Sequence, residues 1–213
     1  ERSLGVSESE LIKIAVKSLG LDDLAPFDPA EKIIEYKLKG AAGDKLVNMD
    51  LVAFADETAS ESPAPGGGSI SAYVGVLGIS LATMVANLSS HKRGWDDRWE
   101  EFSEWAEKGQ AIKNKLLLLV DEDTNAFNKI MSAFGLPKDS DAEKAARSQA
   151  IQDATKYAIE IPFQVMETVY ESFEVIEAMI SVGNPNSITD AGVGALCART
   201  AIMGAFMNVK INT

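Results

Sequence analysis

The sequence predicts an all-α fold: an antiparallel helical bundle with two buried helices rich in small residues, in an oligomeric protein. Apolar residues recur three and four positions apart in every long segment, and no alternating run is long enough for a strand. The connections between these segments are short and contain glycine and proline, which favours antiparallel neighbours. The chain has 213 residues, of which 46% are apolar, enough for one domain and an appendage.

Residues 1–43 are predicted to form a tail or linker in front of the bundle. A short amphipathic helix is expected at residues 7–19, prolines at positions 26 and 29 interrupt the chain, and residues 40–43 are expected to be flexible. The next helix is predicted to begin near Asp44 and to end before Ser60. The predicted division is therefore residues 1–43 and a helical domain over residues 44–213.

A glycine-rich turn, Pro63 to Ser69, opens an uncharged stretch that reaches Ser90. Three consecutive glycines permit the close approach of a ligand or a second chain, at the point where a helix leaves its first N–H groups unpaired. The turn is not a phosphate-binding P-loop, because no Lys-Ser or Lys-Thr pair follows Gly68, and Ser71 replaces the third glycine of a dinucleotide-binding motif. The stretch is long enough to span a membrane, but its polar residues favour a buried helix in a soluble assembly.

This helix separates its faces by size, because small residues recur three or four positions apart on one side and larger apolar residues line another. Residues 189–209 repeat the arrangement, so the two helices are predicted to pack together. Between them, the periodicity predicts helices at residues 97–133, 140–160 and 162–182, the last of which starts at a proline suited to a first helical turn.

Charge and composition exclude several classes of function. A net charge of -12 and a pI near 4.6 argue against a nucleic-acid partner, because phosphate binding needs a basic face. With Cys197 as the single cysteine and His91 as the single histidine, neither a disulfide framework nor a zinc site of the usual ligands is expected. We expect no metal, no membrane span and, since no signal peptide opens the chain, a cytoplasmic location.

One carboxylate lies where an apolar residue is expected. On a helical wheel of residues 116–130, Asp123 falls in the apolar stripe that includes Leu119 and Phe127, whereas Asp121 and Glu122 point away from that stripe. An ionised carboxylate in the interior is costly unless it is paired or hydrogen-bonded. Asp123 therefore pairs with an arginine, caps a backbone group, or has a shifted pKa and acts as an acid or base.

Three further features are candidates for binding, and each has an ordinary structural explanation. Asp190 and Asn208 lie on the small-residue face of the last helix. Asp190 fits a capping box with Ser187, and Asn208 either satisfies a core carbonyl or meets a ligand. Lys92 and Arg93 follow the uncharged helix, where cations stabilise a helix C-terminus or can hold an anionic substrate tail.

Four motifs follow one another along the chain: PAPGGGS at residues 63–69, LVDED at 119–123, GNPNS at 183–187 with Asp190, and GAFMNV at 204–209. In this order they resemble the cyclodeaminase domain of the formimidoyltransferase-cyclodeaminase family. The resemblance covers residues 44–213, and residues 1–43 are similar to the last segment and linker of the family's transferase domain. Family members continue into a further helix after the position of Thr213, so the chain is expected to be a piece of a larger protein.

The resemblance implies a helical homodimer or higher oligomer that cyclises 5-formimidoyltetrahydrofolate to 5,10-methenyltetrahydrofolate with release of ammonia, an ammonia-lyase reaction of histidine degradation and one-carbon metabolism. It implies a folate substrate, with or without a polyglutamate tail, no permanently bound cofactor, and a formimidoyltransferase domain in the full-length protein. Asp123 is the implied catalytic residue, with Asp121 second. The implied folate site comprises Gly66, Gly67, Gly68, Ser69, Asn184, Asp190 and Asn208, with Lys92 and Arg93 at the glutamate tail.

Two other functions stay open. A methenyltetrahydrofolate cyclohydrolase would use the same cleft to add water to the methenyl product, and only substrate assays separate the two reactions. A non-catalytic oligomerisation module for the transferase domain would fit the small-residue helices equally well. A buried Asp123 favours catalysis, because a pure scaffold gains nothing evident from it.

Overall fold

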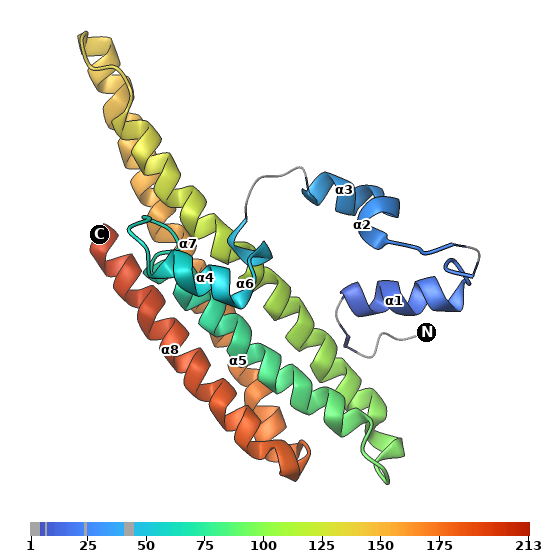
Figure 1. Ribbon diagram of the computed structural model, residues 1–213. Coiled ribbons are helices and arrows are strands. Elements are labelled where there is room, and N and C mark those ends of the chain that lie inside the picture. The colour runs from blue at the N-terminus through green and yellow to red at the C-terminus, as the bar shows by residue number, and fades with distance from the viewer. Residues whose placement is uncertain (1–4, 7, 24, 41–44) are drawn as a thin grey trace.

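The computed structural model describes residues 5–6, 8–23, 25–40 and 45–213, and its main body is a bundle of four long helices (Figure 1). These helices are α5 (Gly67–Ser90), α6 (Trp99–Phe134), α7 (Asp141–Val182) and α8 (Ile188–Asn212). Each packs on its neighbour in the chain, and α5 also packs on α8, which closes the bundle. No strand occurs in the described ranges, and the all-α prediction is confirmed.

The first three helices of the described chain are short: α1 (Glu8–Ser18), α2 (Pro29–Lys32) and α3 (Ile34–Gly40). They lie beside the long helices rather than among them (Figure 1). Helix α1 agrees with the helix expected at residues 7–19. Of residues 40–43, which are expected to be flexible, Gly40 is the last residue of α3, and residues 41–43 lie outside the described residues.

The helix before the glycine turn begins later than predicted. The predicted start near Asp44 lies outside the described residues, η1 (Leu46–Asn48) is a single 3-10 turn, and α4 spans Leu51–Thr58. Asp50 sets the start of α4, because its backbone is extended and its side chain caps two N–H groups of the first turn. Helix α4 then packs on α5 through a ring contact with Tyr73.

Helices α5 and α8 pack closely through their small residues, as predicted. A Cβ atom on Gly78 would lie 2.9 Å from the carbonyl oxygen of Gly194, so the two backbones are in direct contact at this crossing. Fully buried alanines continue the contact along both helices: Ala82, Ala86, Ala198, Ala201 and Ala205.

Helix α8 also has an apolar outer face. Leu196 is 63% exposed, and Met203 and Met207 are exposed on the same side of the helix. By length and composition, Gly67–Ser90 and Pro185–Asn212 are both apolar enough to cross a membrane, and 61% and 22% of their most apolar stretches are buried within the structure. This criterion is weak evidence, since the core helix of a soluble protein also meets it.

Helix α7 is continuous, and the prediction of separate helices at residues 140–160 and 162–182 is wrong. Pro162 lies inside it. A proline there has no N–H to donate, so the carbonyl four positions earlier loses its helical partner. That carbonyl, on Ala158, accepts instead from Nδ2 of Asn212 at 3.1 Å. Packing against α8 thus supplies a partner for the freed carbonyl.

The starts of α7 and α8 are capped differently. Ser140 and Glu143 form a capping box at the start of α7. The capping box predicted for Ser187 and Asp190 is wrong, because Ser187 ends the 3-10 turn η3 (Pro185–Ser187) and its side chain caps no N–H group of the described α8. Asp190 does lie in the first turn of α8, where a carboxylate interacts favourably with the helix dipole.

Candidate active site

Asp123 of α6 lies at the N-terminus of α5. Its Oδ2 accepts from the Ser69 N–H at 2.8 Å and from the Ser69 hydroxyl at 3.0 Å. Helix α5 has Gly66 at its N-cap and therefore no capping side chain of its own. The aspartate of the neighbouring helix takes that role. Of the alternatives for Asp123, the structure thus shows the capping of a backbone group.

The third glycine of the turn is held against this carboxylate. A Cβ atom on Gly68 would overlap Oδ1 of Asp123. A Cβ atom on Gly66 would meet nothing closer than 3.7 Å, and one on Gly67 would lie 3.3 Å from Nδ2 of Asn208. Glycine at position 68 is therefore what allows the carboxylate to reach the start of α5.

The surroundings of Asp123 favour its protonated form. Burial raises the pKa of Asp123, and the two hydrogen bonds from Ser69 offset part of that rise. No cation among the described residues forms an ion pair with this carboxylate. A carboxyl group in this setting gains and loses a proton closer to neutral pH than a solvated aspartate does, which suits a residue that transfers protons.

The two neighbouring carboxylates of α6 have other partners. Oδ1 of Asp121 accepts from the Leu46 N–H at 2.9 Å; burial raises the pKa of Asp121 and this hydrogen bond lowers it. Glu122 accepts from the hydroxyl of Tyr157. Asp121 is therefore tied to the η1 turn and does not line the cavity beside Asp123.

A cavity of about 220 Å³ opens beside Asp123, where the glycine turn meets α6, α7 and the end of α8. Five of the predicted site residues line this cavity: Gly66, Gly67, Gly68, Asp123 and Asn208. A sixth, Ser69, is hydrogen-bonded to Asp123. Asn208 donates from Nδ2 to the Gly204 carbonyl at 2.9 Å, so it satisfies a carbonyl and lines the cavity as well.

Thr124 and Asn212 also line the cavity, although neither was predicted as a site residue, and Phe127 lines it although it was predicted in the buried stripe. Phe127 is 38% exposed, because the hairpin of α6 and α7 runs on beyond the end of α8 (Figure 1). Asn212 lies one helical turn after Asn208, and this spacing is the signal that could have identified it.

No group of three or more His, Cys, Asp or Glu side chains gathers in the part of the chain that the structure describes. The groups that the cavity offers a ligand are a carboxylate, two amides, a hydroxyl and the backbone of the glycine turn.

Four predicted site residues lie at the opposite end of the bundle. Lys92 and Arg93 follow α5, whose 24 residues span about 36 Å. Asn184 comes just before α8, and its N–H donates to the hydroxyl of Ser89 at 2.8 Å. Asp190 lies in the first turn of α8. Within one chain, the structure does not bring these four residues to the glycine turn.

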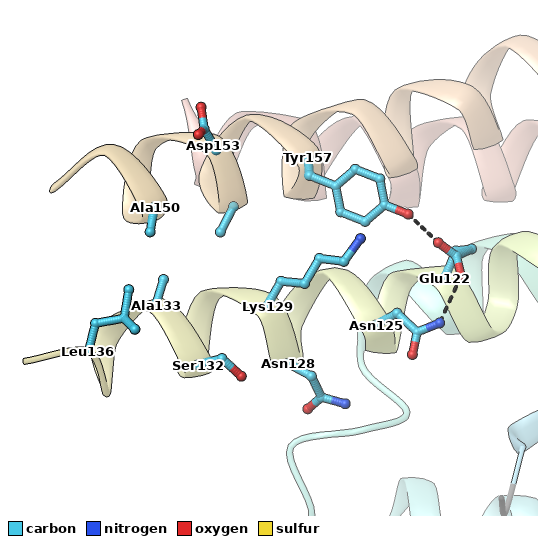
Figure 2. Close-up of a pocket in the computed structure, with 11 residues that line it drawn as sticks. Glu122, Asn125, Asn128, Lys129, Ser132, Ala133, Leu136, Ala150, Asp153 and Tyr157 are labelled. Carbon is cyan, nitrogen blue, oxygen red and sulfur yellow. Dashed lines mark hydrogen bonds between the residues drawn. The ribbon is translucent and has the colours of Figure 1, made fainter. Parts of the chain in front are cut away.

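A larger groove, of about 760 Å³, lies between α6 and α7 (Figure 2). Glu122 accepts there from Tyr157 and from Asn125, and the ammonium of Lys129 lies 3.6 Å from the centre of the tyrosine ring. The hydrogen bond between Glu122 and Tyr157 lowers the pKa of Glu122 and raises the pKa of Tyr157 to about 12. Both oxygens of Glu122 are thus occupied, so the smaller cavity, where Asp123 keeps one oxygen free of such partners, is the better candidate for the chemistry.

Comparison with known proteins identifies the family. The model of the formiminotransferase-cyclodeaminase family matches residues 50–213. This chain belongs to that family. The model of the formiminotransferase domain matches residues 1–39, so segments typical of both parts of a formiminotransferase-cyclodeaminase occur in the chain.

Relatives of this chain are about one-third identical to it. Formimidoyltransferase-cyclodeaminase of Rattus norvegicus is 35% identical over 213 residues, which are 100% of this chain and 39% of the rat protein. Methenyltetrahydrofolate cyclohydrolase of Methylorubrum extorquens is 36% identical over 165 residues, 78% of this chain and 79% of that protein. The crystal structure of formiminotetrahydrofolate cyclodeaminase from Thermotoga maritima aligns with a TM-score of 0.68 and 30% identity over 78% of each chain.

Proposed function

We propose that this chain cyclises 5-formimidoyltetrahydrofolate to 5,10-methenyltetrahydrofolate and releases ammonia. The observation that carries the proposal is Asp123, a carboxylate with a raised pKa and no ion-pair partner among the described residues, at the edge of a cavity. The names of the rat and Thermotoga maritima relatives, both cyclodeaminases, support it.

The reaction moves one proton between two nitrogen atoms of the substrate. N10 attacks the carbon of the protonated formimidoyl group, and the new bond between N10 and carbon leaves a tetrahedral intermediate. The ionised carboxylate of Asp123 accepts the N10 proton and donates it to the amino group. The bond between carbon and that group then breaks, ammonia leaves, and the methenyl product keeps the positive charge. One residue can perform both transfers when its pKa lies near the working pH.

The hydrogen bonds of Asp123 leave one oxygen for this task. Both bonds from Ser69 go to Oδ2, and no described residue donates to Oδ1. Asn208 uses Nδ2 for the Gly204 carbonyl, so its Oδ1 is available to accept from an N–H group of the substrate. A nearby carboxylate also stabilises the positive charge that substrate and product carry.

A second candidate reaction is the hydrolysis of a methenyltetrahydrofolate. The cyclohydrolase of Methylorubrum extorquens favours it, since its identity to this chain is as high as that of the rat protein. In this reaction Asp123 would accept a proton from the water that attacks the methenyl carbon. The two reactions differ in ammonia, which only the cyclodeaminase releases.

An assay that follows methenyl absorbance and ammonia together tests the proposal. With 5-formimidoyltetrahydrofolate, we expect the two products to appear in equal amounts. Asp123→Asn should abolish both while oligomerisation and folate binding stay largely intact. Glu122→Gln is the matched control, because it changes the adjacent carboxylate, whose partners lie in the other groove. Turnover by Asp123→Asn at the wild-type rate would refute the mechanism, and consumption of methenyltetrahydrofolate alone would favour the cyclohydrolase.

The wider setting is also a proposal. We propose a homodimer or higher oligomer in the cytoplasm that takes part in histidine degradation without a permanently bound cofactor, as the reaction itself needs none. The match of residues 1–39 to the formiminotransferase domain supports a transferase domain ahead of this chain in the full-length protein. An ammonia-lyase assignment depends on the ammonia measurement described above.

A further inference from the structure

The cavity beside Asp123 is too small for a whole folate. Sites for drug-sized ligands measure roughly 300–1,000 Å³, whereas this cavity measures about 220 Å³. It has room for the reacting end of the substrate, so the glutamate end with its carboxylates must continue outside. None of the described residues that line the cavity is a lysine or arginine. The described part of a single chain therefore offers these carboxylates no cation at that point.

Two cations at the other end of α5 form no ion pair with any described residue. The ammonium of Lys92 lies 3.8 Å from the centre of the Trp95 ring, and neither Lys92 nor Arg93 forms an ion pair with a described residue. The nearby Arg98, in contrast, donates two hydrogen bonds to Glu101. Lys92 and Arg93 are thus available to bind carboxylates from outside the chain.

An exposed apolar face joins the two ends of the bundle. Helices α5 and α8 lie side by side along it (Figure 1). Its members are large apolar side chains that point outward from these helices: Leu77, Met84, Val193, Leu196, Met203 and Met207. A continuous apolar face on two neighbouring helices is typical of a protein interface.

We propose that a second copy of this chain covers the apolar face in antiparallel orientation, and that Lys92 and Arg93 of the partner subunit hold the carboxylates of a substrate bound at Asp123. A two-fold axis across the middle of α5 exchanges the ends of that helix. Because α5 runs from residue 67 to residue 90, position 92 of one copy then lies level with position 65 of the other, at the glycine turn. The identity of the ligand rests on the proposed function.

Charge decides between this pairing and the parallel one. In a parallel pair, Lys92 and Arg93 would lie beside their own copies, and like charges at an interface repel. In the antiparallel pair they face the end of the bundle that holds α4, where Asp56 and Glu61 are exposed.

Mixed oligomers test the shared site. One chain carries Asp123→Asn, the other carries Lys92→Ala and Arg93→Ala, and the two are refolded together in equal amounts. The first alone should have no turnover, and the second alone should show a KM raised at least about tenfold with little change in kcat, the loss expected for about one charge-assisted hydrogen bond. Random pairing in two-fold dimers makes about one site in four wild type, so about a quarter of the wild-type rate at low substrate should return. A rate equal to the mean of the two separate chains would overturn the inference.

The interface has a test that does not depend on catalysis. Leu196→Asp places a charge on the apolar face and should reduce the size of the assembly in sedimentation velocity. Leu118→Asp is the matched control, because Leu118 is equally exposed but lies on α6, away from this face. If Leu196→Asp leaves the assembly unchanged in size, the inference is wrong even where the wild type is an active cyclodeaminase.

The same experiments separate this inference from the proposed function. If the wild type turns over neither folate, the proposed function fails, and equilibrium binding of 5-formimidoyltetrahydrofolate to the mixed oligomers becomes the measurement. Recovery of tight binding in the mixture supports a site shared between subunits. Binding equal to the mean of the separate variants overturns it.

Discussion

The two ends of α5 are capped in different ways, and the contrast supports the proposed location of the chemistry. At the N-terminal end, an aspartate from another helix accepts from the Ser69 N–H, and burial raises the pKa of this carboxyl group. At the C-terminal end, the hydroxyl of Ser89 accepts from the Asn184 N–H and donates to the Val85 carbonyl. A neutral hydroxyl gives a stable end, whereas a buried carboxylate costs stability, and the proposed role of Asp123 in proton transfer would account for that cost.

Among changes at the two ends of α5, Gly68→Ala at the N-terminal end is expected to have the largest effect on turnover. The new methyl group would overlap Oδ1 of Asp123 and displace the carboxylate. A displacement of about 1 Å can cost roughly 100-fold in rate, so we expect turnover of 5-formimidoyltetrahydrofolate to fall by at least about that factor. Steady-state kinetics measures the loss.

The control for this variant lies at the other end of the bundle. A Cβ atom on Gly192 meets nothing within 4 Å, so Gly192→Ala should keep turnover within about twofold of wild type. Full activity in Gly68→Ala would show that the close approach of Asp123 to α5 is not needed for the reaction.

As the pH rises through the pKa of Asp123, turnover should increase, whereas the contribution of Asp123 to stability should decrease. The carboxylate must be ionised to accept the N10 proton, so turnover should fall about tenfold for each pH unit below its raised pKa. Folding raises this pKa, so protonation of Asp123 stabilises the fold in acid, and that contribution is lost as the pH rises through the folded pKa. Wild type should thus gain melting temperature in acid relative to Asp123→Asn. If the difference in melting temperature between wild type and Asp123→Asn is the same at every pH, the raised pKa is contradicted.

At the C-terminal end of α5, Ser89→Ala should affect stability alone. The change leaves the Asn184 N–H without its acceptor, at a cost of about 1–3 kcal/mol in the free energy of unfolding. Ser80→Ala is the control, because that hydroxyl bonds only the Val76 carbonyl one turn earlier. Urea denaturation compares the two variants. A large loss of kcat in Ser89→Ala would mean that this end takes part in the chemical step itself.

The smallest effect is expected in the groove of Figure 2. Tyr157→Phe removes the hydroxyl that donates to Glu122, the main cause of the lowered pKa of that carboxyl group. The pair is partly exposed, so we expect a loss of about 0.5–1 kcal/mol in unfolding free energy. A lowered pKa stabilises the fold above the unfolded pKa, so the difference from wild type should shrink as the pH falls through the lowered value. A fall in turnover like that of Gly68→Ala would move the active site to this groove.

Helical periodicity predicted the bundle and the special position of Asp123 for one physical reason. The direction of a side chain around its helix follows from the sequence spacing alone, so a carboxylate among Leu116, Leu119 and Val120 must face the neighbouring helices. The same spacing predicted that the small faces of α5 and α8 would meet. Both predictions depend on local geometry, which the sequence contains.

What the sequence could not show depends on groups that are distant along the chain. Helix α7 continues through Pro162 because a residue of α8 supplies the missing donor, and no local pattern announces such a partner. The resemblance likewise implied one site for Asn184, Lys92 and the glycine turn, although the length of α5 separates them within one chain. Antiparallel packing of α5 on α8 places the residue after one helix beside the residue before the other, so motifs that follow one another in the sequence can lie at opposite ends of the bundle.

The proline of α7 also couples two distant positions of the chain. Pro162 frees the Ala158 carbonyl, Asn212 occupies it, and both of these partners line the cavity beside Asp123. A residue with an N–H group at position 162 would restore the helical hydrogen bond and compete with the asparagine for the same acceptor. Positions 162 and 212 are therefore expected to vary together among related sequences, because the carbonyl that the proline leaves without a helical donor is the one that holds α8 against α7.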